Sequence, residues 1–550
     1  MVAEMDKNMM TEQLFRDNIL SNIYNNFAYY FRYENLYQYV IWLMVILLLN
    51  WAVVKICFAG SYSSFIPNKK YIFAGKNGKN MLGFLLLAIS LGAYCVCLFC
   101  TEKSIFSSFD SMSQDFVETM KQGTKAVFKE WRFTPLQAFD YNIMFGISNN
   151  YTVLGCYAVL KQVIIMGVLY KLLMFIPTVT RLVCLSVINF VPAVFWINSA
   201  IFPEQNIIIF TVLSLLALIE YQKEQKSRYL LYFLLCMNVA MYSKETVILF
   251  YLGLIIYLLV AAIVEEKITI DSFWHPIKTL RQFPLEYLMF VSMFLYATGF
   301  MIFTVYGTME NRYIDTHVYP LIEVIKCYAI ELFVVLAAVG IMFYKISCGK
   351  QMFLLKEGSV IGSAIVTFVI VFYMQICPTS DCFLSYYLYL PVVFCVSYIF
   401  ANCGNWKVLA IVAVLITVVS GAINYNTYNL RQGQDRLAMA EVIAAKAGDE
   451  TVVFLYSSKS KDYKWWTMES WAAALKYLVP DMKLKFKSDA LWDLRQYVNE
   501  NYVRPETIIG KPEIGDYILV NKIDNPEYAA QKGAEIVYEN KTYRLYLLKE

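Results

Sequence analysis

The chain has 550 residues and a net charge of +4; 59% of its residues are apolar and 16% are charged. Soluble domains carry about 25% charged residues, and fibrous or disordered chains are rich in Gly and Pro, so both classes are excluded. The small net charge gives no basis for nucleic-acid binding. The composition predicts a polytopic α-helical membrane protein, in which each ionisable side chain near the bilayer is costly and has a task.

Long apolar runs recur along the chain, and about 20 such residues cross a bilayer. Residues 1–35 lack the basic start and cleavage site of a secretory signal peptide. We expect residues 1–80 to be an N-terminal extension with an extra membrane helix, which places the N-terminus outside, and residues 81–424 to be the transmembrane domain. About twelve spans are predicted: Leu36–Phe58, Met81–Cys100, Thr152–Ile176, Arg181–Asn198, Asn206–Tyr221, Tyr229–Tyr242, Thr246–Val264, Leu285–Tyr306, Val324–Tyr344, Gly358–Ile376, Phe383–Phe400 and Trp406–Ile423.

The links between these spans differ in charge, and this difference sets the direction of the chain. Lys and Arg gather in every second link, which identifies the cytoplasmic side. The basic links are 61–80, 222–228, 268–284, 345–357 and the segment that contains Lys407. The opposite, extracytoplasmic side then holds 101–151, 199–205, 243–245, 307–323, 377–382 and everything beyond residue 424.

Residues 425–550 have a different character and are predicted to form a small extracytoplasmic α/β domain. Leu437–Ala447 and Trp465–Leu478 have helical patterns, and the second is followed by Pro480. Three short apolar runs are predicted strands: Thr451–Tyr456, Tyr517–Val520 and Tyr543–Leu548.

The 13 cysteines show no zinc-ligand spacing, and most lie within apolar runs, where a thiol behaves as a small apolar group. Cys377 and Cys382 flank a short polar link; a disulfide is an alternative there, but we expect free thiols. The chain has only two histidines, so no metal site is predicted.

The outward link 101–151 is too long to be a simple connection. The link begins directly after a span, so we expect Asp110 to lie close to the membrane surface, and Asp115 lies in the same link. A carboxylate at the membrane surface can act as a general base on a hydroxyl group. The alternative interpretation is an amphipathic helix that lies on the bilayer.

Four outward segments resemble, in this order, the motifs of one enzyme superfamily. They are Arg132–Leu136, Phe195–Ser199 with Glu204, Ser243–Glu245 and Tyr386–Pro391. The set is similar to the GT-C membrane glycosyltransferases, and closest to the tetratricopeptide-associated O-mannosyltransferase branch and its bacterial relatives. The chain departs from the pattern where Ser111 follows Asp110 in place of a second acid, and where Tyr386 stands in place of an Arg.

The resemblance implies a reaction and a set of site residues. The enzyme would move a sugar from a polyprenyl-phosphate donor to a cell-envelope glycan or protein, with inversion and with Asp110, or secondly Asp115, as general base. Donor phosphate and sugar would be bound by Arg132, Lys244, Glu245, Arg312 and His317. Glu204, Tyr386 and Tyr387 would bind the acceptor or support the structure. A divalent cation is left open, because some members of the superfamily use one.

Each assignment has an alternative. Lys244 and Glu245 could pair with each other at a helix end, and Glu204 is expected to be solvated at an interfacial turn. Trp465, Trp466 and Trp471 could stack on an acceptor sugar, although we expect them to dock their helix on the membrane part. A lipid-linked glycan transporter is the second function considered, and Asn189 and Pro192 within a span are consistent with it. A third is a catalytically inactive partner protein of the same superfamily.

Overall fold

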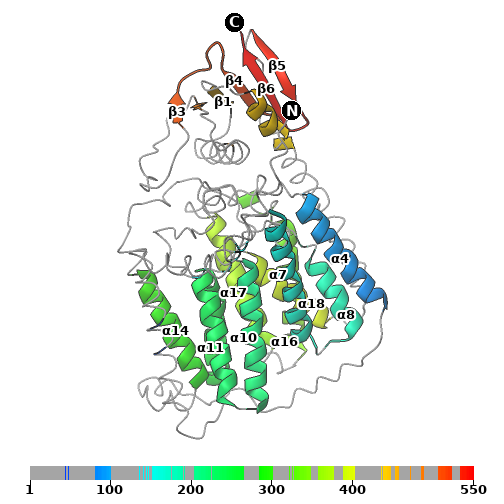
Figure 1. Ribbon diagram of the computed structural model, residues 1–550. Coiled ribbons are helices and arrows are strands. Elements are labelled where there is room, and N and C mark those ends of the chain that lie inside the picture. The colour runs from blue at the N-terminus through cyan, green and yellow to red at the C-terminus, as the bar shows by residue number, and fades with distance from the viewer. Residues whose placement is uncertain are drawn as a thin grey trace.

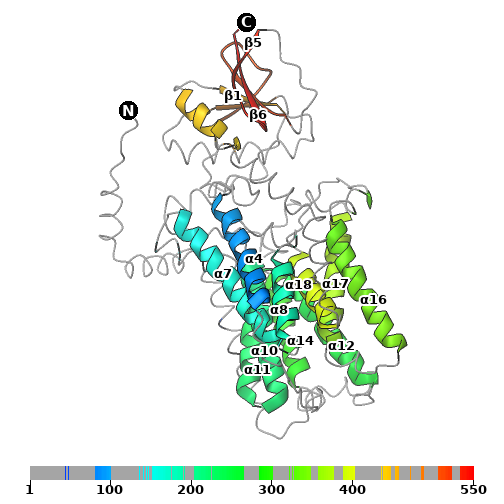
Figure 2. The ribbon, with the colours of Figure 1, turned by 90° about the vertical axis from the view of Figure 1, so that its right-hand side faces the viewer.

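The computed structural model describes a helical part and a β-sheet (Figures 1 and 2). The described residues are 44, 48, 81–100, 136, 140, 144, 147, 151–174, 176–189, 191, 204–224, 226–264, 284–301, 321, 322, 325, 328–348, 357–376, 388–402, 435, 436, 438–446, 452–456, 471, 485–488, 506–522 and 533–549. The sheet lies beyond one end of the helices in both views.

The helices correspond to the predicted apolar runs. In chain order they are α4 (Met81–Cys100), α7 (Tyr151–Leu172), α8 (Thr178–Ile188), α10 (Glu204–Glu224), α11 (Ser227–Ser243), α12 (Val247–Val264), α14 (Pro284–Phe300), α16 (Ala329–Ser347), α17 (Glu357–Ile376) and α18 (Tyr389–Asn402). The predicted spans Leu36–Phe58 and Trp406–Ile423 lie outside the described residues, apart from Met44 and Leu48. The number of spans therefore stays a prediction.

Length and composition separate these helices into two groups. Among the described residues, Gly155–Leu172 and Glu204–Tyr221 are long and apolar enough to cross a bilayer, and six further apolar stretches are shorter. Large apolar side chains such as Phe294 and Phe343 are exposed on α14 and α16, as expected for faces that meet lipid. By contrast α8 is buried along almost its whole length, so it is an internal helix of the bundle.

A chain of buried amides and a hydroxyl joins α4, α7 and α8. Gln162 donates to Asn189 Oδ1 (2.7 Å), and Asn189 donates in turn to Ser90 Oγ (3.0 Å). Asn189 is fully buried, and its side-chain polar groups are satisfied by these neighbours. It therefore holds helices together, which removes the support that Asn189 gave to the transporter hypothesis.

The C-terminal residues form a six-stranded mixed sheet with the order β3-β2-β1-β4-β6-β5. The first four neighbours pair in parallel and the β4-β6-β5 group is antiparallel. The strands are β1 (Val452–Tyr456), β2 (Lys485–Ser488), β3 (Glu506–Ile509), β4 (Tyr517–Asn521), β5 (Ala534–Glu539) and β6 (Tyr543–Leu548). The structure confirms the three predicted strands, and residues 438–446 of the first predicted helix are helical.

One expectation about the tail is wrong. Trp471, which we expected to dock on the membrane part, is buried against Tyr543 of β6 with ring centroids 5.2 Å apart. The Arg436 guanidinium lies over both rings and also donates to the Tyr543 hydroxyl (3.0 Å). An indole gains more from full burial against an edge-on aromatic neighbour and a guanidinium than from partial burial at an interface. Trp465 and Trp466 lie outside the described residues.

A buried lysine fixes the connection between β3 and β4. Lys487 of β2 is 4% exposed, and its Nζ lies 3.1 Å from Asp516 Oδ2 and 3.1 Å from Glu513 Oε1. Asp516 Oδ2 also accepts from the backbone N–H of Glu513 (2.8 Å). The ammonium therefore neutralises a nearly buried carboxylate and holds residues 510–516 across the sheet.

We expect Lys487→Met to loosen the parallel half of the sheet, because it leaves Asp516 buried without its cation. Breaking such a pair costs about 3 kcal/mol or more, which corresponds to roughly hundredfold faster amide exchange by local opening. Hydrogen–deuterium exchange of β1 and β4 in the full chain measures this effect. Lys522→Met is the matched control, because its pair with Glu539 is partly exposed and is worth less than about 1 kcal/mol. Equal protection in the two variants would contradict the assignment.

Candidate functional site

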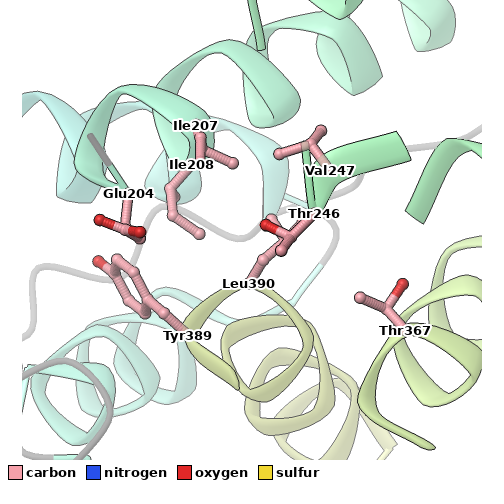
Figure 3. Close-up of a pocket in the computed structure, with 8 residues that line it drawn as sticks. All are labelled: Glu204, Ile207, Ile208, Thr246, Val247, Thr367, Tyr389 and Leu390. Atoms are coloured by element: carbon pink, nitrogen blue, oxygen red, sulfur yellow. The ribbon is translucent and has the colours of Figure 1, made fainter. Parts of the chain in front are cut away.

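A small pocket lies where the ends of several helices meet (Figure 3). It is lined by Glu204, Ile207 and Ile208 of α10, Thr246 and Val247 at the start of α12, Thr367 of α17, and Tyr389 and Leu390 of α18. Its volume of about 20 Å³ is room for a water molecule. The pocket collects residues from three of the four motif segments or their immediate neighbours.

Glu204, which lines this pocket, belongs to a buried ion pair with Lys244, which lies behind the pocket wall. Lys244 Nζ lies 3.1 Å from Glu204 Oε1, and the two side chains are 3% and 6% exposed. Glu204 is the first residue of α10, where a negative charge is favoured by the helix dipole, and Lys244 follows the last residue of α11, where a positive charge is favoured. Burial of both charges is tolerated because each compensates the other.

The local sequence explains why Lys244 points inward. Helix α11 ends at Ser243, whose hydroxyl donates to Val239 O (2.7 Å), and Lys244 leaves the helical conformation with φ −161° and ψ 132°. The chain then turns at once into α12, whose first amides donate to the carbonyls of Lys244 and Glu245. Apolar runs on both sides force this short turn to stay at the end of two packed helices.

A second ion pair, between a buried lysine and a partly buried aspartate, lies near the first. Asp140 Oδ2 is 3.2 Å from Lys161 Nζ of α7 and accepts a hydrogen bond from the Tyr157 hydroxyl (2.8 Å). The Lys161 side chain is only 3% exposed. Burial raises the pKa of Asp140, but Lys161 and hydrogen bonds from Asn206 and Tyr157 outweigh it and hold this pKa below its ordinary value. Asp140 is therefore ionised at neutral pH.

The two pairs form one network. Lys161 also interacts electrostatically with Glu204, so the charges alternate in the order Asp140, Lys161, Glu204, Lys244. The first turn of α10 is held on α7, because Gln205 donates to Ala158 O (3.4 Å). The end of the long outward link is held on α11, because the Leu136 N–H donates to Tyr242 O (3.0 Å). The four described members of this network are two carboxylates and two ammonium groups, whose charges cancel.

Tyr389 adds a hydroxyl group that the sequence analysis overlooked. Figure 3 shows its ring beside Glu204, with the hydroxyl pointing toward the carboxylate. The side chain is 1% exposed and begins α18. The sequence analysis chose Tyr386 and Tyr387 from the same motif. Tyr389 could have been selected from the sequence, because it follows Tyr386 by three residues, the spacing at which two side chains share one face if the segment is helical.

The structure places only some of the predicted site residues. Asp110, Asp115, Arg132, Arg312, His317, Tyr386 and Tyr387 lie outside the described residues, as do Cys377 and Cys382. Their roles stay predictions. Glu245 is half-buried in the turn beside Lys244. The expectation that Glu204 is solvated is wrong, because α10 begins inside the bundle and Lys244 of the neighbouring link supplies its counter-charge.

The described part of the site does not fit a metal ion. Among the residues that the structure describes, no three His, Cys, Asp or Glu side chains come together. Asp140 and Glu204 each have a lysine ammonium against them, and this positive charge repels a divalent cation.

The opposite end of the bundle has a different character. Lys226 and Arg228, in the link between α10 and α11, pair with Glu224 through side chains that are 36–58% exposed. This link lies at the end of the helices away from the sheet (Figure 1). The Glu204–Lys244 pair and the exposed basic residues near Lys226 therefore lie at opposite ends of α10 and α11. This arrangement is consistent with the prediction that they face opposite sides of the membrane.

Comparison with known proteins finds a likeness to one family over part of the chain. Residues 134–277 match the family described as dolichyl-phosphate-mannose-protein mannosyltransferase, and this range contains both buried ion pairs. The match covers part of the transmembrane domain predicted from the sequence and is a likeness to a glycosyltransferase family.

The other comparisons add a structural likeness. The chain is similar to the crystal structure of ArnT from Cupriavidus metallidurans bound to undecaprenyl phosphate, with 12% sequence identity and a TM-score of 0.44 over 84% of this chain and 97% of that one. No curated protein matches the sequence.

Proposed function

We propose that this protein transfers a sugar from a polyprenyl-phosphate donor to a cell-envelope glycan or protein on the extracytoplasmic face of the membrane. The observation that carries the proposal is the buried Glu204–Lys244 pair, whose carboxylate lines a pocket together with Tyr389. Motif segments far apart in the sequence meet there. The matched family supports the donor class, because its description names a sugar carried on a dolichyl phosphate.

The proposed reaction requires a base for the acceptor and cations for the leaving group. Asp110, in the first outward link, takes the proton from the acceptor hydroxyl while that oxygen attacks the anomeric carbon of the donor. The bond between this carbon and the phosphate oxygen breaks, and the configuration inverts. Negative charge develops on the departing lipid phosphate, and preorganised cations stabilise it.

Lys244 is the described cation for this task, and the proposal adds Arg132 and Arg312 from the same predicted side. In the structure Glu204 holds Lys244 in place. When the lipid phosphate enters, we propose that it competes with Glu204 for the Lys244 ammonium, and that the Tyr389 hydroxyl donates to whichever anion lies nearest. Glu204 thereby keeps a buried ammonium oriented in the absence of donor.

The test is sugar transfer by the full chain in lipid nanodiscs, with undecaprenyl-phosphate mannose as the first donor of a panel of undecaprenyl-phosphate sugars. We expect Asp110→Ala to lower the transfer rate by about a thousandfold, the scale of a lost general base. Ser111→Ala is the matched control and should keep the wild-type rate. Full activity of Asp110→Ala would reject Asp110 as the base. Movement of an intact lipid-linked sugar between leaflets, without transfer, would favour the transporter instead.

A further inference from the structure

Asp140 and Lys161 have no part in the proposed reaction, yet they are built into the same end of the bundle. Lys161 lies in the third turn of an apolar helix, where an ionised side chain is costly unless it is compensated. Its ammonium is 3.2 Å from Asp140, and its helix is held against the start of α10 by the Gln205–Ala158 hydrogen bond, so that Lys161 and Glu204 interact electrostatically. Asp140 is fixed further by the Tyr157 hydroxyl at 2.8 Å.

The charges of the neighbouring side chains affect how strongly an anion binds to Lys244. Glu204 and Asp140 supply two negative charges, and Lys161 and Lys244 supply two positive charges. In this buried setting each charge acts strongly on its neighbours, because little water screens it. A phosphate that displaces Glu204 from Lys244 leaves a carboxylate that needs another cation, and Lys161 is the described cation already beside it.

We propose that the Asp140–Lys161 pair sets the affinity of the pocket for the lipid phosphate, by deciding how much of the Lys161 charge is available to Glu204. Asp140 holds Lys161 back and keeps Glu204 on Lys244. The phosphate is therefore bound with moderate affinity and released after transfer. This inference rests on the proposed function, and it makes Asp140 and Lys161 positioning residues rather than groups that touch the donor.

The proposal predicts changes of opposite sign for two neutralising substitutions. Asp140→Asn frees Lys161 to pair with Glu204, which releases Lys244 toward the phosphate and leaves the network one unit more positive. Lys161→Met leaves Asp140 and Glu204 without the ammonium that both interact with, and it removes one positive charge from the network. The double variant Asp140→Asn/Lys161→Met restores neutrality. Loss of a merely structural pair would instead weaken binding in both single variants.

The experiment measures the affinity of the full chain in nanodiscs for undecaprenyl phosphate by native mass spectrometry. We expect Asp140→Asn to bind about fivefold more tightly, Lys161→Met about tenfold more weakly, and the double variant within about twofold of wild type. Lys161→Arg keeps the charge and should stay within about twofold. If Lys161→Met does not fold, Asp140→Asn decides alone: tighter binding supports the proposal, and unchanged or weaker binding overturns it.

The same measurements distinguish failure of the proposed function from failure of the proposed role of Asp140 and Lys161. If the wild-type chain does not bind undecaprenyl phosphate, or if Lys244→Met leaves its affinity unchanged, the proposed function is wrong at this site. If wild type binds and Lys244→Met weakens binding, while Asp140→Asn and Lys161→Met weaken it alike or leave it unchanged, only the role of Asp140 and Lys161 is wrong.

Discussion

Replacing Lys244 with Met should both destabilise the outer end of the bundle and abolish sugar transfer. The substitution leaves Glu204 charged and buried, and breaking a buried pair in this way costs about 3–5 kcal/mol. It also removes the proposed phosphate cation. The double variant Glu204→Gln/Lys244→Met removes both charges, so we expect it to regain most of the stability and none of the activity.

Thermal unfolding in nanodiscs and the transfer rate measure these two effects separately. Lys226→Met is the matched control, because this lysine is 58% exposed at the opposite end of α10 and α11 and should change neither quantity. Recovery of transfer in the double variant would show that Lys244 only neutralises Glu204. A single variant as stable as wild type would show that the buried pair does not form.

Gly253→Leu should have the largest effect on the transmembrane part without touching the polar network. A Cβ atom at this glycine would lie 2.9 Å from Ser363 Cα, which is backbone of α17 and cannot move like a side-chain end. Small residues let membrane helices approach this closely. Ser363 lies one turn before Thr367, which lines the pocket and donates to the Ser363 carbonyl (2.7 Å). Forcing α12 and α17 apart would therefore also distort the pocket.

Overpacking of this kind costs about 1–3 kcal/mol for a single methyl group, and a leucine should exceed this range. The unfolding temperature of the chain in nanodiscs, and its yield as a monodisperse protein, measure the loss. Gly167→Leu is the control, because a Cβ at this exposed position of α7 meets nothing within 4 Å. Similar losses in the two variants would contradict the close approach of α12 and α17.

The helices could be predicted because apolar runs of this length permit few alternatives to a helix. The site was only partly predictable. The charged link at Lys244 indicated a functional helix end, but its ion pair with Glu204 of another helix was not among the predictions. Which carboxylate pairs with Lys244 depends on which helices are neighbours in the fold, and the local sequence does not determine this. Lys161 was overlooked although a lysine inside an apolar run is itself a signal.

The sheet shows the same division between local and long-range information. β1, β4 and β6 are apolar and rich in β-branched or aromatic residues, so their sequences indicate strands. β2 alternates Lys485, Phe486 and Lys487, and this pattern does not reveal that Lys487 is buried beneath a later segment. Its burial depends on Asp516 and Glu513, which reach it only after the chain crosses the sheet.

The most direct test of the central claim is a cryo-electron microscopy map of the full chain in nanodiscs with undecaprenyl phosphate. The account predicts phosphate density between Lys244 and Tyr389, with the lipid chain leaving between helices at the end of the bundle that faces the sheet. Phosphate density at the opposite end, near Lys226 and Arg228, would contradict it.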